Sequence, residues 1–308
     1  MNKSNTPGKI LSLLHLGYSV RDRGNSLDFH SDKMDAKGNR TQRGDAPYIS
    51  MVIGVKGTIM DSASIEYGEN RPMVELLQFI NPPPNVIREY KPGEPSYSQI
   101  GYHTSDIRAC YDRMIEKELT PLGPVTQIDY GFGKGREAFL LKDPDNMYVQ
   151  IVQDEKYEQG QGKVIGQDHL VLSVPNLDET IPIFRDLLCS EVKTEDVSGS
   201  EYLSSYCQNP VKRVAVCKFE LENYTVELWE TGGAGGVENL YISEPGSIHL
   251  CFSCQGIDNL YEQFKAAGMR FVNEPVLVTK GVNEGAKAIF SHAPGYLWFE
   301  LLCRKDRF

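Results

Sequence analysis

Histidine and glutamate residues recur at corresponding positions along the chain. A His or Gln opens each of four apolar segments, at His15, Gln99, His169 and His249. A Glu or Gln lies inside each of four later apolar segments, at Glu75, Gln150, Glu227 and Glu300. Imidazole and carboxylate ligands together suit Zn²⁺, Ni²⁺, Co²⁺, Mn²⁺ or Fe²⁺ better than Ca²⁺ or Cu⁺. The recurring residues therefore predict a site for a divalent first-row metal ion.

The spacing of these residues indicates a fourfold internal repeat. The intervals from each opening residue to the matching Glu or Gln are 60, 51, 58 and 51 residues. The first segment thus matches the third in length, and the second matches the fourth. Equivalent positions in the two halves lie 150 to 154 residues apart, which is typical of a duplicated domain. We call the four segments modules one to four.

The length of 308 residues is sufficient for two domains, each with its own hydrophobic core. Residues 155–163 are polar and rich in glycine, which is typical of a surface linker. We therefore predict an N-terminal domain over residues 1–155 and a C-terminal domain over residues 164–308.

Module three shows most clearly which elements position the predicted ligands. A strand over residues 169–174 precedes apolar residues at helical spacing that begin at Leu177, with Asn176 as the expected N-cap. Three further strands are predicted over residues 202–206, 214–221 and 224–229. The order of elements is therefore βαβββ.

Modules two and four repeat this order. Their helices are predicted over residues 107–118 and 257–267, the latter ending at Gly268. Module one is the poorest copy, because the polar stretch after Val20 has no long apolar period. We expect its helix to be short or irregular.

Four βαβββ modules with these residues on their first and last strands resemble the vicinal oxygen chelate superfamily. This superfamily includes glyoxalases, epimerases, extradiol dioxygenases and bleomycin-resistance proteins. The resemblance covers essentially the whole chain. It implies an α+β, glyoxalase-like fold in which modules pair into two cupped mixed sheets. It also implies that the first and last strands of each module supply ligands to a metal ion in the cup.

The predicted ligand set is complete in the second half of the chain and incomplete in the first. The full set in modules three and four is His169, Glu227, His249 and Glu300. Module two has Gln99 and Gln150 instead, and glutamine is a weak neutral ligand, so we predict one metal ion per chain. Two alternatives stay open: His103 shares a strand face with Gln99, and Gln is a ligand in some members of the superfamily.

Two ways of pairing the modules give a full set. Consecutive pairing gives the set just described. Exchanged pairing, as in some fused glyoxalases of the superfamily, joins modules one and four. The exchanged set is His15, Glu75, His249 and Glu300. We favour consecutive pairing because it requires no exchange of chain segments.

The resemblance implies a metal-dependent enzyme that moves a proton on a small carbonyl or hydroxy substrate. The metal would stabilise an enediolate-like intermediate. A carboxylate beside the metal would carry the proton, and the candidates are Glu300 and Glu227. Return of the proton to the same carbon makes an epimerase, and transfer to its neighbour makes an isomerase or a glyoxalase-type lyase.

Two other functions are alternatives. Ring-cleaving dioxygenases that are similar in sequence pattern use two His and one Glu to bind Fe²⁺. The corresponding residues here are His169, His249 and Glu300. Glu227 would then crowd a coordination position, and His292 or Tyr296 would be acid/base candidates. The second alternative is a metal-free protein that binds a small molecule.

Composition limits the partners and the location. The net charge is −10 with no stripe of Lys and Arg, which argues against nucleic acid and favours a small-molecule substrate. No apolar run approaches the roughly 20 residues of a membrane span, so we expect no membrane insertion. The first residues lack a hydrophobic signal segment. We expect a cytoplasmic monomer or homodimer.

The seven cysteines are odd in number and scattered, so we interpret them as reduced thiols. Cys251 and Cys254 form a C-x-x-C pair, but an interval of three on a strand places their side chains on opposite faces. We interpret both as packing residues. Two glycine-rich loops, over residues 130–136 and 231–236, are expected to be mobile, and the second follows the strand of Glu227 as a lid would.

Overall fold

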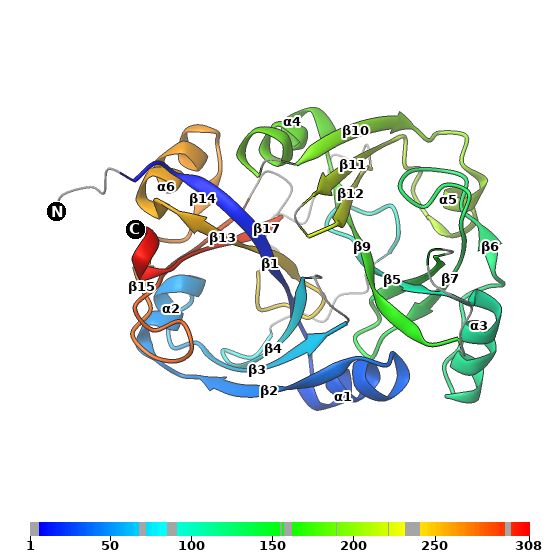
Figure 1. The fold of residues 1–308 in the computed structure, drawn as a ribbon, viewed down its shortest axis with the longest axis horizontal. Coiled ribbons are helices and arrows are strands. Elements are labelled where there is room, and N and C mark those ends of the chain that lie inside the picture. Colours follow the sequence, from blue (N-terminus) through cyan, green and yellow to red (C-terminus); the bar gives the residue numbers. More distant parts are fainter. Residues whose placement is uncertain are drawn as a thin grey trace.

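The computed structural model describes residues 6–67, 72–84, 91–154, 156, 162–188, 190–220, 222–231, 241–292 and 297–308. The strands form two mixed sheets with short helices packed around them, as the predicted α+β class requires (Figure 1). The helices are α1 (Arg23–Asp28), α2 (Pro47–Ile53), α3 (Ile107–Glu116), α4 (Leu177–Pro182), α5 (Glu201–Tyr206) and α6 (Ile257–Ala266). Among the described residues, no helix is long and apolar enough to cross a membrane.

The first sheet is built from modules one and four. Its strand order is β14-β16-β17-β13-β1-β4-β3-β2, and β15 pairs with β16. The strands from module one are β1 (Lys9–Ser19), β2 (Lys37–Gly44), β3 (Ile59–Glu66) and β4 (Met73–Asn81). The strands from module four are β13 (Ile248–Gln255), β14 (Arg270–Phe271), β15 (Val276–Leu277), β16 (Lys287–His292) and β17 (Trp298–Cys303).

The second sheet is built from modules two and three. Its strand order is β10-β11-β12-β9-β5-β8-β7-β6. The strands from module two are β5 (Ser98–Thr104), β6 (Thr126–Gln127), β7 (Glu137–Lys142) and β8 (Tyr148–Gln153). The strands from module three are β9 (Val164–Val174), β10 (Glu191–Asp196), β11 (Arg213–Phe219) and β12 (Tyr224–Glu230).

The modules are exchanged between the two halves of the chain. In each module the first and last strands pair in parallel, as β1 does with β4 and β13 with β17. This leaves one edge of each first strand open, and the edge of β1 is covered by β13 while that of β5 is covered by β9. In Figure 1 the blue strand β1 accordingly lies beside the gold strand β13. The consecutive pairing that we favoured is therefore wrong, since each sheet draws on both halves of the chain.

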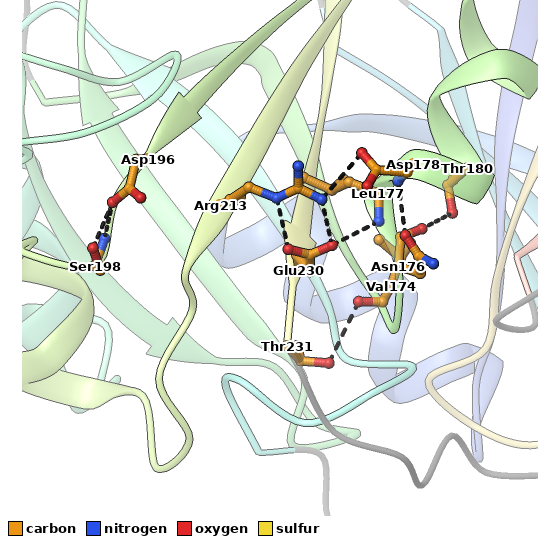
Figure 2. Close-up of polar contacts among 10 residues, drawn as sticks. All are labelled: Val174, Asn176, Leu177, Asp178, Thr180, Asp196, Ser198, Arg213, Glu230 and Thr231. Carbon is orange, nitrogen blue, oxygen red and sulfur yellow. Dashed lines mark hydrogen bonds and ion pairs between the residues drawn. The ribbon is translucent and has the colours of Figure 1, made fainter.

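The start of α4 agrees with the sequence pattern. The Asn176 side chain accepts a hydrogen bond from the backbone N–H of Asp178 at 2.9 Å, as expected of an N-cap (Figure 2). Glu230 on β12 accepts the N–H of Leu177 at 3.0 Å and forms two hydrogen bonds of 2.8 Å with Arg213 on β11. These contacts attach the helix to the second sheet. After Pro182 the helix widens into a π-helical turn, Ile183–Leu187.

One strand was predicted in the wrong place. Residues 202–206 belong to helix α5, because the Ser200 side chain caps it by accepting the N–H of Leu203 at 3.0 Å. The strand of this module is β10 instead, which is mostly polar and exposed at the edge of the sheet. Such a strand has no apolar alternation by which the sequence could indicate it.

The other predicted helices are confirmed with small shifts of their ends. The helix of module four ends before Gly268, which has a φ of +87°. The helix of module one is short, as expected, and continues from α1 into a π-helical turn, Phe29–Lys33.

Candidate metal centre

Four predicted ligand residues converge on the central strands of the first sheet. They are His15 on β1, Glu75 on β4, His249 on β13 and Glu300 on β17. The Nε2 atom of His15 lies 3.3 Å from Nε2 of His249, 3.5 Å from Oε2 of Glu75 and 3.4 Å from Oε2 of Glu300. His249 Nε2 lies 3.5 Å from the same Glu300 oxygen. This is the exchanged set.

These separations suit donors that share one ion. Zn–N and Zn–O bonds are about 2.0 to 2.2 Å long, so adjacent donors on one ion lie about 3.0 to 3.5 Å apart. A proton on His15 cannot hold the four groups together in place of a metal ion. Its single Nε2–H cannot donate to a second imidazole and two carboxylates at once. The four residues therefore fit a divalent cation.

The charges of the donors depend on one another. Burial alone would raise the pKa of Glu300, but hydrogen bonds from His15 and His249 outweigh burial and hold it well below its ordinary value. Burial opposes protonation of both imidazoles. The carboxylates of Glu300 and Glu75 overcome it at His15 and raise its pKa, whereas burial prevails at His249 and lowers its pKa. Glu300 is thus ready to bind a cation as a carboxylate.

A glycine allows the His249 imidazole to reach this position. Gly17 on β1 is the cross-strand partner of His249, and a Cβ atom there would lie 1.7 Å from Cε1 of the ring. The other side of the ring packs against Phe290 on β16, with ring centroids 4.9 Å apart. The ring is therefore fixed between a bare backbone and an aromatic side chain.

Apolar side chains border the donors. They belong to a buried hydrophobic cluster, whose members include Ile49, Val52, Leu77, Phe79, Cys251, Trp298 and Leu302. Because side chains alternate along a strand, Leu77 lies on the same face as Glu75, and Leu302 on the same face as Glu300. Charge interactions among the donors are strengthened in such surroundings.

The sequence reasoning missed two side chains near the donors. Tyr48 on α2 lies in the field of Glu300 and Glu75, and burial together with these carboxylates raises its pKa. Cys251 on β13 forms a cluster with His15 and Glu300 in which the potential ligand atoms all lie within 4.8 Å of one another. The repeat contained a signal for Cys251, since the residue two positions after the opening residue is glycine in modules one and two.

Residues 166–298 match the family described as Glyoxalase/Bleomycin resistance protein/Dioxygenase superfamily. The matched residues lie in modules three and four and make up less than half of the chain. None of the curated proteins matches the chain in sequence.

Two solved structures are similar to this chain in fold over 96% of its length. Glyoxalase I from Zea mays is similar with a TM-score of 0.66 at 16% sequence identity, over 96% of this chain and 92% of that chain. A putative dioxygenase from Bacillus subtilis subsp. subtilis str. 168 is similar with a TM-score of 0.62 at 11% identity, over 96% of this chain and 86% of that chain. At these identities the likeness shows the glyoxalase-like fold alone.

The second sheet holds the counterpart of this site, but its residues bind other protein groups. The Glu227 carboxylate accepts hydrogen bonds from Trp229 Nε1 at 2.7 Å and from the backbone N–H of Phe132 at 2.8 Å. Gln99 accepts a hydrogen bond from the Tyr97 hydroxyl at 2.6 Å, and Gln150 donates one to the Tyr202 hydroxyl at 2.9 Å. The structure thus does not bring His169 and Glu227 together with His249 and Glu300, contrary to our first choice of ligands.

The glycine-rich loop over residues 130–136 contacts this second set, and its mobility stays a prediction. Its Arg136 forms two hydrogen bonds to Asp168, at 3.0 and 2.8 Å, and lies over the ring of Phe132. Phe132 in turn contacts the His169 imidazole, with ring centroids 5.8 Å apart. Of the other glycine-rich loop, residues 232–236 lie outside the described residues.

Two further candidates from the sequence lie elsewhere. His103 forms a buried cluster with Asp154 and Asp168. It does not act as a substitute ligand beside Gln99, and Arg136 already supplies positive charge to Asp168. His292 packs against Trp298 at the end of β16, and Tyr296 lies outside the described residues.

Proposed function

We propose that the first sheet binds one divalent first-row metal ion through His15, Glu75, His249 and Glu300. We further propose that the protein moves a proton on a small substrate with neighbouring carbonyl or hydroxyl oxygens, as an isomerase, epimerase or glyoxalase-type lyase. The convergence of four donors within 3.3 to 3.5 Å of their neighbours is the observation that carries the proposal. When bound, a divalent ion supplies Lewis-acid stabilisation of negative charge on substrate oxygens.

Glu75 is the best candidate for the group that carries the proton. Glu300 contacts both imidazoles, whereas the ion pair of Glu75 is with His15. The Glu75 side chain is also the most accessible of the four donors, at 18% exposed against 15% for Glu300, 11% for His15 and 2% for His249. Glu75 takes over the role that we first gave to Glu227, since the two occupy equivalent positions in modules one and three.

The fourth donor argues against an iron-dependent dioxygenase. The members of the superfamily with that activity use two His and one Glu, and Glu75 would occupy a position that O₂ or a catecholate requires. The convergence of the donors likewise argues against a metal-free binding protein, because two half-buried carboxylates held close together are costly without a cation between them.

Metal content tests the proposed centre. After reconstitution with Zn²⁺, Co²⁺, Ni²⁺ or Mn²⁺, the wild type should retain one ion per chain. His15→Ala should lose this ion, while the matched variant His169→Ala in the second sheet should keep it. A wild type that retains no ion, or loss of the ion from His169→Ala instead, would contradict the proposal.

Solvent isotope exchange tests the reaction class. Hydroxy-ketones, keto-sugars and 2-oxo acyl compounds are incubated with the metal-loaded protein in D₂O without oxygen. Incorporation of deuterium at the carbon next to the carbonyl, abolished by chelation, is the expected result. Oxygen-dependent cleavage of a catechol without any such exchange would favour the dioxygenase instead.

A further inference from the structure

Cys251 lies among the donors of the proposed metal centre. It follows His249 by two residues on β13, so both side chains lie on the same face of the strand, and it is fully buried. Its cross-strand partner on β1 is His15. The potential ligand atoms of His15, Cys251 and Glu300 all lie within 4.8 Å of one another.

The position of Cys251 is exceptional within the repeat. In the first sheet His249 faces Gly17, and in the second sheet His169 faces Gly101. In both pairs the imidazole takes the place of the missing Cβ, at 1.7 and 2.2 Å from Cε1. Across these antiparallel pairings, His15 is the one of the three histidines whose partner has a side chain, and that side chain ends in sulfur.

The distances suit a donor to the same ion. Two donors on one zinc ion lie at most about 4.4 Å apart, the sum of a Zn–S bond of about 2.3 Å and a Zn–N bond of about 2.1 Å. The separations of the potential ligand atoms are therefore within a few tenths of an ångström of those expected around one zinc ion. Cys251 belongs to a buried apolar cluster, and such surroundings exclude water molecules that would compete with sulfur for the ion.

We propose that Cys251 is a fifth protein ligand, whose sulfur binds the metal ion held by His15, Glu75, His249 and Glu300. This inference rests on the proposed function. A sulfur donor favours Zn²⁺ or Co²⁺ over the harder Mn²⁺ and Mg²⁺. Five protein donors leave one free position on a six-coordinate ion, so a substrate that chelates through two oxygens must displace one of them. Glu75 is the most exposed of the His and Glu donors and would be the one to make room for such a substrate.

Cobalt substitution tests the sulfur donor. Thiolate bound to Co²⁺ gives an intense near-ultraviolet charge-transfer band, while weaker visible bands report bound Co²⁺ whatever its ligands. Cys251→Ala should lose the charge-transfer band and keep the visible bands. Cys254→Ala, a variant of an equally buried cysteine on the opposite face of β13, should keep both. Zinc affinity of Cys251→Ala should fall by at least the roughly 10- to 100-fold that loss of an outer-shell partner costs.

X-ray absorption of the zinc-loaded wild type requires no variant. It should show one sulfur at about 2.3 Å beside nitrogen and oxygen at about 2.0 to 2.2 Å. A shell of nitrogen and oxygen alone, or visible cobalt bands without the charge-transfer band, would overturn the sulfur ligand and leave the four-donor centre intact. Absence of all cobalt bands from the wild type would overturn the centre and the sulfur ligand together.

Discussion

The imidazole of His249 lies directly over the backbone of Gly17 on the neighbouring strand. A Cβ atom at position 17 would lie 1.7 Å from Cε1 of that ring, far inside van der Waals contact. Any side chain at this position must therefore push His249 away from the other three donors. Gly17 is therefore as necessary to the proposed centre as the donors themselves.

Gly17→Ala should consequently abolish binding of the metal ion. The matched control is Gly101→Ala, whose Cβ would lie 2.2 Å from Cε1 of His169 in the second sheet. Both variants should lose about 1 to 3 kcal/mol of unfolding free energy through overpacking. Elemental analysis after reconstitution should find the ion only in Gly101→Ala. Retention of the ion by Gly17→Ala would show that His249 is not a ligand.

Glu75→Gln should reduce proton transfer at saturating metal by about 10²- to 10⁴-fold, the usual contribution of an acid/base group. The variant keeps the size of the side chain and removes its basicity. Deuterium exchange into substrate measures the loss. Glu66→Gln, at an exposed position at the end of β3, should exchange at the wild-type rate. Unchanged exchange in Glu75→Gln would place the base elsewhere.

Glu227→Ala should destabilise the protein without changing its metal content. The substitution leaves the N–H groups of Trp229 and Phe132 without their acceptor, and the buried Trp229 N–H alone costs about 1 to 3 kcal/mol when it is unsatisfied. Urea unfolding and elemental analysis measure the two effects. If the ion were lost while the fold persisted, the second sheet would be the metal site.

Asp143→Asn should raise the unfolding free energy relative to the wild type, and this gain should be larger at pH 8 than at pH 5. Burial raises the pKa of Asp143 from 3.8 to about 7, although a hydrogen bond from Tyr18 opposes this. The folded state thus holds the proton more tightly than the unfolded chain, and stability falls as pH rises from about 4 to about 7. One pKa unit corresponds to about 1.4 kcal/mol, so the wild type should lose up to about 2 to 3 kcal/mol more than the variant. Equal losses in unfolding experiments at the two pH values would contradict this.

The internal repeat contained the two histidines and two glutamates that converge in the first sheet, but it did not point to Cys251. It could not decide which modules pair, because His15 and His169 occupy equivalent positions and both sets satisfy the same strand alternation. The pairing depends on which strand lies against the open edge of β1. That strand is β13, and the contact joins His15 and His249, which are 234 positions apart in the sequence. No local pattern contains this information.

Cys251 and helix α5 show two further limits of sequence patterns. The alternation of β13 correctly placed Cys251 and Cys254 on opposite faces, but the pattern did not reveal that His15 lies across from Cys251. At α5, the two tyrosines and the leucine between them favour a strand by residue type. The segment forms a helix capped by Ser200 instead. In this helix Tyr202 and Tyr206 lie one turn apart, and their ring centroids are 5.5 Å from each other.

The exchange of modules orders events during synthesis of the chain. The second sheet is formed by a continuous stretch between Ser98 and Glu230, so it can be complete while the ribosome still adds residues. The first sheet must wait, because β1 has its antiparallel partner only when β13 emerges, followed by β17 with Glu300. Until then, module one exposes an unpaired strand edge that invites association with other chains. Binding of an ion at the proposed centre would therefore require that β13 and β17 have been synthesised and that β13 has paired with β1.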